Sequence, residues 1–387
     1  MPRINYQTGN QLQLLHTGEM FFPALLKAID HATTEIYLET YIFANDQSSQ
    51  EIEAALGRAA ARGVRVYVIV DWIGSGRDHS IALQQRLAQQ GVQCRIFNVW
   101  FKRGLVRTHR KLCVIDQTIA FIGGINIVDD LLTDHIPPQP LPFARWDFAI
   151  ELAGSCVATI YKEITAQWLK LGTMPILNRL LLARDLRRAV MIKNEQASAA
   201  AIVFRDNLRN RFTIQRAYLK ALGRAKTTAY FANPYFAPGR RLRNGLINAA
   251  KRGVDVRILL GVGEFELQDL VTQSYYPKLL QHGIKIYEYH RTHMHAKVAV
   301  IDQQWSTVGS SNFDGLSLFL NHEANILIND PKLSLELEAH LQVGFDQSVE
   351  VTAEMIGKQT WIKRLKNRFA YTLYRWVLQL LTLGEYR

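Results

Sequence analysis

The sequence predicts an α/β protein made of two similar halves that pack with pseudo-twofold symmetry. Three observations lead to this prediction. Strand-like apolar runs alternate with helix-like segments, this alternation occurs in both halves of the chain, and one short polar motif occurs at a matching place in each. The chain has 387 residues, enough for two domains that each bury a sizeable core. Its content of 48% apolar and 21% charged residues is typical of globular proteins.

In each half we expect a strand, a helix and a second, buried strand to follow one another. Their predicted ranges are 34–43, 49–62 and 63–71 in the first half, and 228–236, 241–251 and 253–260 in the second. Both helices end in basic residues followed by Gly63 or Gly253, a combination that stops helices. A further helix ends at Gly91 in the first half and at Gly283 in the second, so matching positions keep a nearly constant separation. This repetition indicates a duplicated unit.

The repeated motif combines a histidine, a lysine and an asparagine at one spacing. Its two copies are His109, Lys111, Asp116, Gly123, Gly124, Asn126 and His295, Lys297, Asp302, Gly309, Ser310, Asn312. Histidine transfers protons near neutral pH, lysine supplies positive charge and asparagine supplies an amide donor, so each copy can surround one phosphate. Two copies predict two half-sites that face each other and supply a nucleophile and an acid for breaking a phosphodiester.

We expect each motif to lie on a β-hairpin. In the first copy, residues 108–115 form a strand, a turn follows at Asp116, and 119–122 return to the two glycines. His109 and Lys111 are two residues apart and therefore face the same side. Asp116 and Asp302 belong to the candidate catalytic set as members of the motif. Because each falls at the hairpin turn, we expect them to shape the turn rather than to take part in chemistry.

Two other acids are candidates for orienting the histidines. Asp147 and Glu323 are each the single acidic residue of an apolar strand downstream of a motif. A carboxylate that holds one imidazole nitrogen leaves the other nitrogen free to react. The alternative is an acid at a strand end on the surface, which the apolar neighbours on both sides disfavour.

The charge of the chain favours anionic partners. Lys and Arg number 46 against 34 Asp and Glu, a net charge of +12 that suits nucleic acid, acidic lipid headgroups or small phosphates without choosing among them. The three cysteines are scattered, so neither a disulfide framework nor a zinc knuckle is expected. No segment resembles a signal peptide or is apolar enough to span a bilayer, and we expect a soluble or peripheral protein.

Two segments lie outside the repeated halves, which we place at 1–172 and 206–350. Residues 173–205 are expected to connect them, with arginines interleaved with leucines in either a core helix or a surface-binding helix. Residues 351–387 are expected to end in a basic amphipathic helix. Its tryptophans and basic residues around an apolar stretch suit a lipid interface, and closing the core is the alternative.

These features resemble the phospholipase D superfamily over nearly the whole chain, and within it the short bacterial cardiolipin synthases. The superfamily resemblance rests on the two complete motifs. The narrower resemblance rests on short sequence stretches at 9–10, 38–43, 309–314 and 320–325. It implies two α/β halves, each a mixed β-sheet flanked by helices, with the active site at their seam.

The resemblance also implies a mechanism. His109 would attack phosphorus as a neutral imidazole and form a phosphohistidine, and His295 would protonate the leaving alcohol and then deprotonate the incoming one. The motif itself is symmetric, so His109 is favoured as nucleophile by analogy only. The residues expected to hold the phosphate are Lys111, Lys297, Asn126, Asn312 and Ser310. Neither a cofactor nor a metal is expected, because two lysines supply the positive charge.

The leading hypothesis is a cardiolipin synthase that joins two phosphatidylglycerol molecules and releases glycerol. It would act peripherally at the cytoplasmic side of the cell membrane on anionic phospholipid, with no nucleic acid partner and an undetermined oligomeric state. Trp100 and Phe101 are candidates to line an apolar channel for the lipid. The alternatives are a phospholipase D-type hydrolase or headgroup-exchange enzyme, then a nuclease, and last a binding module without activity.

Overall fold

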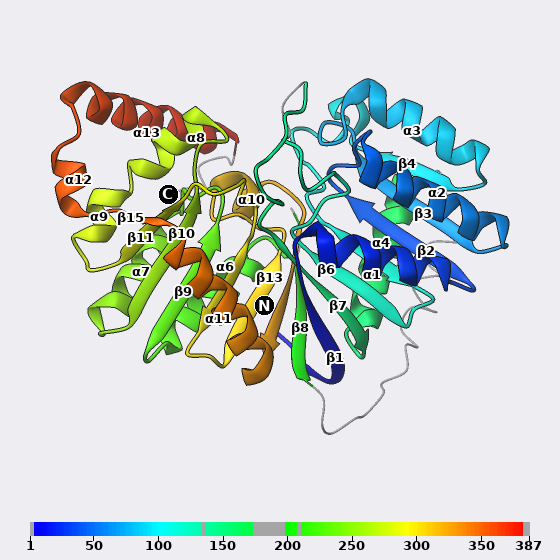
Figure 1. Cartoon of the computed structure of the whole chain (residues 1–387), viewed down its shortest axis with the longest axis horizontal. Coiled ribbons are helices and arrows are strands. Elements are labelled where there is room, and N and C mark those ends of the chain that lie inside the picture. The colour runs from blue at the N-terminus through cyan, green and yellow to red at the C-terminus, as the bar shows by residue number, and fades with distance from the viewer. Residues whose placement is uncertain (1–3, 134–136, 173–197, 207–209, 382–387) are drawn as a thin grey trace.

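The computed structural model describes residues 4–133, 137–172, 198–206 and 210–381. Within these residues, a single sheet of fifteen strands runs through the molecule, with helices on both of its faces (Figure 1). The strands of the N-terminal half are β1 (Gln7–His16), β2 (Glu35–Thr40), β3 (Arg65–Asp71), β4 (Gln93–Phe97), β5 (Leu112–Ile115), β6 (Ile119–Gly123) and β7 (Phe148–Gly154). Those of the C-terminal half are β8 (Ser198–Arg205), β9 (Thr228–Asn233), β10 (Asp255–Gly261), β11 (Lys285–Tyr289), β12 (Val298–Ile301), β13 (Trp305–Gly309), β14 (Glu323–Asn329) and β15 (Val349–Glu350).

The strand order shows the predicted pseudo-twofold symmetry. Outward from the central pair, the order is β1-β7-β6-β5-β2-β3-β4 in one direction and β8-β14-β13-β12-β9-β10-β11 in the other, with β15 added at the far edge. Within each half, the three outer strands of this series are parallel and the others antiparallel. The antiparallel pair β1–β8 joins the two halves at the seam. The prediction of two α/β halves with mixed sheets is confirmed.

The segment expected to connect the halves is only partly a connection. Residues 198–205 form β8, which pairs with β14 along its whole length and with β1 across the seam. The reason is the apolar run Ala199–Phe204, which the interior of a sheet favours. The remainder of the predicted connection, 173–197, lies outside the described residues.

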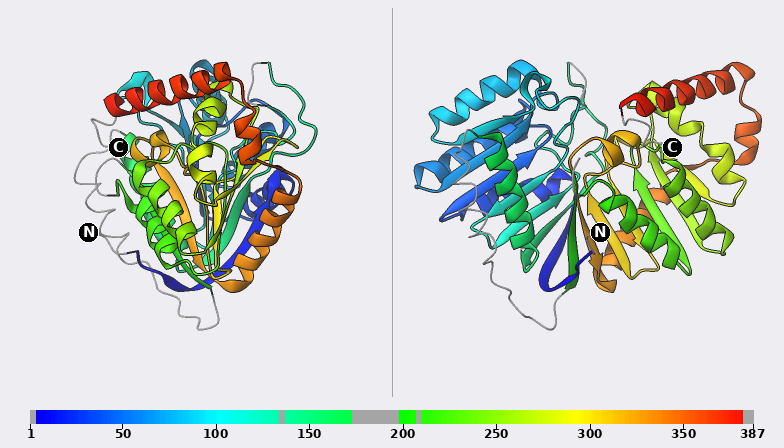
Figure 2. Two further views of the ribbon diagram at one scale, coloured as in Figure 1. Left: turned by 90° about the vertical axis from the view of Figure 1, so that its left-hand side faces the viewer. Right: turned by 180° about the vertical axis from the view of Figure 1, so that it is seen from behind.

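Helices cover both faces of each half (Figure 2). The helices of the N-terminal half are α1 (Thr17–Asp30), α2 (Gln47–Ala61), α3 (Arg77–Gln89), the short 3₁₀ helix η1 (Val99–Phe101) and α4 (Val157–Leu171). Those of the C-terminal half are α6 (Thr213–Arg224), α7 (Arg240–Lys251), α8 (Glu266–Gln273), α9 (Tyr276–Leu280), α10 (Gly315–Phe319), α11 (Pro331–Asp346), α12 (Ala353–Gly357) and α13 (Trp361–Leu381).

Three apolar clusters hold these layers together. One lies beneath α1 and α2, one beneath α6 and α7, and the third continues from α4 across the seam to α11. The shared third cluster makes the two halves one packed body, which is what keeps residues from both halves in register at the seam. Burial of this apolar surface is the main stabilising contribution to such a fold.

The expected helix stops are present. Gly63 and Gly253 adopt the left-handed region, with φ of 91° and 90°, directly after α2 and α7. The next residue, Val64 or Val254, donates its N–H back to Ala59 or Ala249 in the last turn. The strands β3 and β10 follow as predicted, so the repeated strand–helix–strand unit is confirmed in both halves.

Candidate active site

The two motif copies meet at the seam, and backbone pairing between the halves brings them together. The N–H of His109 donates to the carbonyl of His322 at 2.9 Å, and the N–H of His295 donates to the carbonyl of Trp146 at 2.9 Å. His322 and Trp146 are the residues directly before Glu323 and Asp147. Each histidine is therefore fixed beside an acid of the opposite half.

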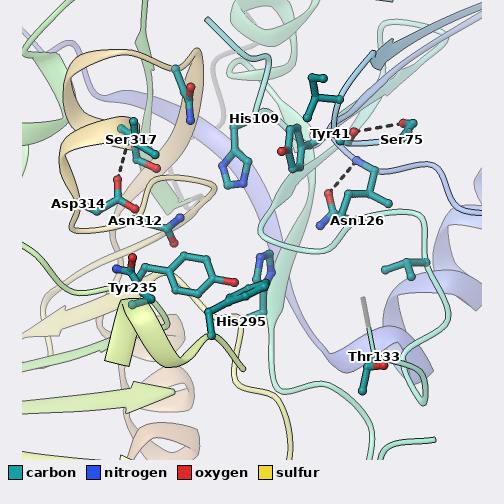
Figure 3. Close-up of a pocket in the computed structure, with 18 of the residues that line it drawn as sticks. Tyr41, Ser75, His109, Asn126, Thr133, Tyr235, His295, Asn312, Asp314 and Ser317 are labelled. Atoms are coloured by element: carbon teal, nitrogen blue, oxygen red, sulfur yellow. Dashed lines mark hydrogen bonds between the residues drawn. The ribbon is translucent and has the colours of Figure 1, made fainter. Parts of the chain in front are cut away.

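The side chains follow this crossed pairing. The Nδ1 atom of His109 lies 3.1 Å from Oε2 of Glu323, and Nδ1 of His295 lies 2.7 Å from Oδ2 of Asp147. Both acids are buried, with 0% and 1% of their surface exposed. With Nδ1 engaged, the Nε2 atom of each ring is left for a ligand, and both rings point into the same cavity (Figure 3). Sequence reasoning identified both acids but not that each serves the histidine of the other half.

The first pair favours a neutral imidazole beside a carboxylate. Burial lowers the pKa of His109 below its ordinary value. Although burial of Glu323 acts in the opposite direction, the hydrogen bond from His109, the charge of Lys111 and the hydroxyl of Ser310 lower the pKa of Glu323. At neutral pH, Glu323 therefore remains ionised and accepts the Nδ1 proton.

In the second pair, Asp147 and His295, the pKa of the acid is raised instead of lowered. Burial raises the pKa of Asp147 to about 7, and burial lowers the pKa of His295 well below its ordinary value. Both directions favour an uncharged pair in which one proton is shared over 2.7 Å. The half-site of Asp147 and His295 is thus the one that keeps an exchangeable proton at neutral pH.

Both motif lysines are buried and poised to receive an anion. The Nζ atom of Lys111 donates to the carbonyl of its own His109 at 2.8 Å, and Nζ of Lys297 donates likewise to His295. Burial and the charge of Lys297 lower the pKa of Lys111 to about 7, and burial lowers the pKa of Lys297 to about 8. A bound phosphate would supply the missing negative charge and restore both ammonium groups.

The two motif asparagines line the cavity but are held differently. Oδ1 of Asn126 accepts the N–H of Ile42 at 3.2 Å, which leaves the amide nitrogen of Asn126 as a donor for a ligand. Oδ1 of Asn312 is buried and has no hydrogen-bond partner within the described part of the chain. Both asparagines thus line the cavity that also contains the two histidines.

Ser310 does not hold the position predicted for it. Its hydroxyl donates to Oε2 of Glu323 and accepts the N–H of Ala324 at 3.0 Å. Its carbonyl lies 3.1 Å from Nδ1 of His109. The structure therefore makes Ser310 a positioning residue for the acid and histidine, in place of the predicted contact with phosphate.

Asp116 and Asp302 lie at the opposite ends of β5 and β12 from the histidines. The carboxylate of Asp116 accepts the backbone N–H groups of Thr33, Thr34 and Glu35, all between 2.8 and 3.0 Å. The carboxylate of Asp302 accepts those at 226–228 in the same way. Both residues have positive φ, as a two-residue hairpin turn requires. They anchor the hairpins and are not catalytic, which corrects their inclusion in the candidate catalytic set.

A large cavity opens over the two histidines. It has a volume of about 1180 Å³ and is lined by both motif asparagines, by Tyr41 and Tyr235, and by apolar side chains. Those from α8 and α13 are Leu267, Val271, Ala370, Leu373 and Val377. The ring of Tyr41 meets that of His109 edge to face, with centroids 4.8 Å apart, a contact the sequence did not reveal.

Trp100 and Phe101 do not line this cavity, contrary to the prediction. Trp100 is 71% exposed, and both rings pack against Trp72 instead. Apolar residues of both halves line the cavity, among them Ile42, Ile73 and Leu132 of the N-terminal half, and α8 and α13 contribute an apolar wall. Among the described residues, no group of three His, Cys, Asp or Glu side chains is arranged to hold a metal ion.

Comparisons with known proteins agree with this geometry. The family model described as "Cardiolipin synthase, PLD-like domain" matches residues 25–133 and 218–343, one stretch in each half. Cardiolipin synthase B of Salmonella typhi is 36% identical over 96% of this chain and 90% of its own length. The protein of that name from Escherichia coli K12 is 35% identical with the same coverage. A minor cardiolipin synthase of Bacillus subtilis is 29% identical over 92% of this chain and 86% of its own length.

Solved structures share the fold at low identity. A phosphatidylserine synthase from Haemophilus influenzae superposes with a TM-score of 0.69 at 13% identity, covering 98% of this chain and 97% of that one. A polyphosphate kinase from Porphyromonas gingivalis does so with a TM-score of 0.54 at 14% identity, covering 86% and 50%. Both likenesses concern the fold alone. With matching sequence in both halves and both motif copies complete, this chain belongs to the cardiolipin synthase family of phospholipase D-like proteins.

Proposed function

We propose that the chain is a cardiolipin synthase, a phosphatidyltransferase that joins two phosphatidylglycerol molecules and releases glycerol. The observation that carries the proposal is the pair of crossed histidine–acid contacts at a cavity that apolar side chains of α8 and α13 also line. The first feature suits phosphodiester chemistry, and the second suits the tail of a lipid. Relatives named cardiolipin synthase B, matched over 96% of this chain and 90% of their own length, support the choice of lipid.

In the first step, Nε2 of His109 attacks the phosphorus of one phosphatidylglycerol. The N–P bond forms as the bond to the glycerol oxygen breaks, and that oxygen takes a proton from His295. In the second step, the terminal hydroxyl of another phosphatidylglycerol gives its proton to His295 and attacks phosphorus. The P–N bond breaks, cardiolipin leaves, and His109 is restored.

The assignment of His109 as nucleophile is supported by the unequal acids. Glu323 stays ionised and holds the Nδ1 proton, so the lone pair of Nε2 on His109 is available for attack. Asp147 has a pKa of about 7, so its pair with His295 keeps a proton to give and to recover. A nucleophile needs the first environment and an acid–base group needs the second.

Four side chains would carry the charge of the transition state. Lys111 and Lys297 are buried beside the histidines and would carry their charge once a phosphate is bound, and Asn126 and Asn312 line the cavity. Oriented donors in a site that excludes water stabilise developing charge without reorganisation. The net charge of +12 also favours a position at an anionic membrane surface, and we place the protein peripherally on the cytoplasmic side of the cell membrane.

Hydrolysis or headgroup exchange is the second candidate, since water or a small alcohol can take the place of the second lipid. The apolar wall from α8 and α13 favours the lipid acceptor over water. The same wall disfavours the nuclease alternative, because a nucleic acid duplex presents a charged phosphate backbone to its partner.

The test is to incubate the protein with phosphatidylglycerol vesicles and to identify the products by mass spectrometry, with His109→Ala as the control. Cardiolipin and glycerol in equal amounts, absent from the control, are expected. Phosphatidic acid without cardiolipin would assign the protein to hydrolysis. Degradation of an oligonucleotide with no lipid product would favour a nuclease.

A further inference from the structure

The last helix, α13, has two apolar faces, and only one of them packs on the protein. It lies across the top of the C-terminal half in Figure 1 and contacts α8. The inward face buries Asn367, Ala370 and Leu378, with 6%, 2% and 1% of their surface exposed. The hydroxyl of Tyr374 accepts the N–H of Gly315, close to the loop that carries Asn312. This face fixes the helix to the wall of the active site.

The outward face exposes a stripe of large apolar side chains. They recur at intervals of three or four residues, which places them on one side of the helix. The stripe consists of Ile362, Leu365, Phe369, Leu373, Trp376 and Leu380. Phe369 is 68% exposed and Trp376 is 60% exposed. Single exposed apolar residues are ordinary on a protein surface, whereas a contiguous row indicates a surface that is covered in use.

The positive charge around this stripe favours an anionic partner. Between Trp361 and Leu381 there is no Asp or Glu, and the basic residues are Lys363, Arg364, Lys366, Arg368 and Arg375. The first four of these are exposed. An apolar stripe with tryptophan, flanked by basic residues, is the pattern of helices that lie in the interface of an anionic bilayer. No helix of the described chain is long and apolar enough to cross a membrane.

The outward face continues into the catalytic cavity. Leu373 and Val377 are 41% and 39% exposed, and both also line the cavity that contains His109 and His295. They form an apolar edge that leads from the surface of α13 to the active site. A lipid whose acyl chains lay against the outward face could reach the cavity along these two apolar side chains.

We propose that α13 docks flat on an anionic phospholipid bilayer and that its Leu373–Val377 edge admits the acyl chains of the substrate lipid into the catalytic cavity. The identity of that lipid rests on the proposed function. The docking itself rests on the exposed stripe, its basic border and its continuity with the cavity.

The first test measures binding of the full chain to vesicles. The variant carries Phe369→Glu and Trp376→Glu, which lie in the stripe but do not line the cavity. The matched control carries Leu335→Glu and Val343→Glu on α11, which are 48% and 51% exposed. Wild type and control should co-sediment with vesicles of phosphatidylglycerol and phosphatidylcholine, and the stripe variant should bind roughly tenfold or more weakly. Equal binding of all three, or no binding by wild type, would overturn the proposal.

A second variant, Lys366→Glu with Arg368→Glu, keeps the apolar stripe and reverses two exposed charges. It should lose most of the preference for phosphatidylglycerol vesicles over pure phosphatidylcholine vesicles, and added salt should weaken the wild type towards the same level. An unchanged preference contradicts an anionic partner. Circular dichroism of each variant checks that the fold is retained.

A third measurement separates docking from chemistry. Glycerol release is followed from phosphatidylglycerol vesicles and from a short-chain phosphatidylglycerol held below its micelle concentration. The Phe369→Glu, Trp376→Glu variant should lose activity on vesicles and keep wild-type activity on the dissolved lipid. If wild type releases glycerol from neither substrate, the proposed function fails. If the variant keeps its activity on vesicles, the docking proposal alone fails.

Discussion

The two half-sites share one motif and one backbone arrangement, yet they differ in the acid and in what surrounds it. Glu323 receives the hydroxyl of Ser310 in addition to its histidine. At the matching place of the other half stands Gly124, where an added Cβ would lie 2.3 Å from Oδ1 of Asp147. The shorter acid thus fills the space of the missing side chain and lacks the serine hydroxyl. The two halves thus share the same geometry, but the pKa of Glu323 is lowered whereas that of Asp147 is raised to about 7.

The two motif asparagines differ in the same sense. Asn126 is held through its oxygen by the backbone of Ile42, whereas the oxygen of Asn312 has no partner in the described structure. Asn312 also lies beside the loop that α13 contacts through Gly315. The N-terminal half-site therefore presents the more rigid support, and the C-terminal one adjoins the apolar wall from α13.

The largest effect is expected from removing either histidine. His109→Ala should lower kcat for cardiolipin formation by roughly 10⁴-fold and His295→Ala by roughly 10³-fold, because the first loses the nucleophile and the second the proton transfer. Steady-state kinetics on phosphatidylglycerol vesicles measures both. Equal activity of either variant and wild type would remove that histidine from the mechanism.

Replacing the acids distinguishes the two half-sites. Glu323→Gln should lower kcat by roughly 10²-fold, because it removes a charge that is present at neutral pH beside the nucleophile. Asp147→Asn should lower kcat by roughly tenfold at pH 6, because Asp147 is then mostly protonated in the wild type, and by more at pH 8. The check is kcat against pH for both variants. A loss for Asp147→Asn that does not depend on pH contradicts the difference inferred for the two acids.

The lysines predict a pH effect on substrate affinity. With pKa values of about 7 and about 8, Lys111 and Lys297 carry their charge below pH 7 and lose it as pH rises through 8. The KM for phosphatidylglycerol should therefore increase with pH over this range. Lys111→Arg should flatten part of the rise, because arginine stays charged throughout. A KM that falls with pH in the wild type is the contrary outcome.

The smallest effect on activity is expected at Asp116. Asp116→Asn removes the carboxylate that accepts three backbone N–H groups and should cost roughly 1 kcal/mol of stability, with kcat nearly unchanged. Burial opposes the effect, but these hydrogen bonds lower the pKa of Asp116. Its contribution is thus present above the unfolded pKa of about 3.9 and is lost as pH falls below it. Thermal unfolding at pH 7 and pH 3 should show a difference from wild type that shrinks at the lower pH.

Most of the fold could be predicted because its strands and helices follow from short stretches of the sequence. The apolar runs and the glycine stops at Gly63 and Gly253 marked the strand–helix–strand units, and their repetition marked the duplication. The strand β8 was missed because it follows a long segment without a clear pattern, although its own apolar run suits a strand.

The residues of the site could be predicted from the sequence, but which acid contacts which histidine could not. Asp147 and Glu323 stood out as lone acids in apolar strands, yet their crossed contacts depend on the pairing of Trp146 with 293–295 and of His322 with 107–109 across the seam. Residues more than a hundred positions apart give no local sign of such pairing. The position of Ser310 and the apolar wall from α13 depend on the same tertiary arrangement and were also not predictable.

The unequal roles of the histidines can be tested with a phosphatidyl ester of p-nitrophenol, whose leaving group needs no protonation. His295→Ala should then release p-nitrophenol in a burst of one equivalent per protein and retain a phosphatidyl adduct on the peptide that contains His109, because the second step lacks its base. His109→Ala should give neither burst nor adduct. A burst from His109→Ala with an adduct on the peptide that contains His295 would contradict the account, because the two half-sites would then have exchanged roles.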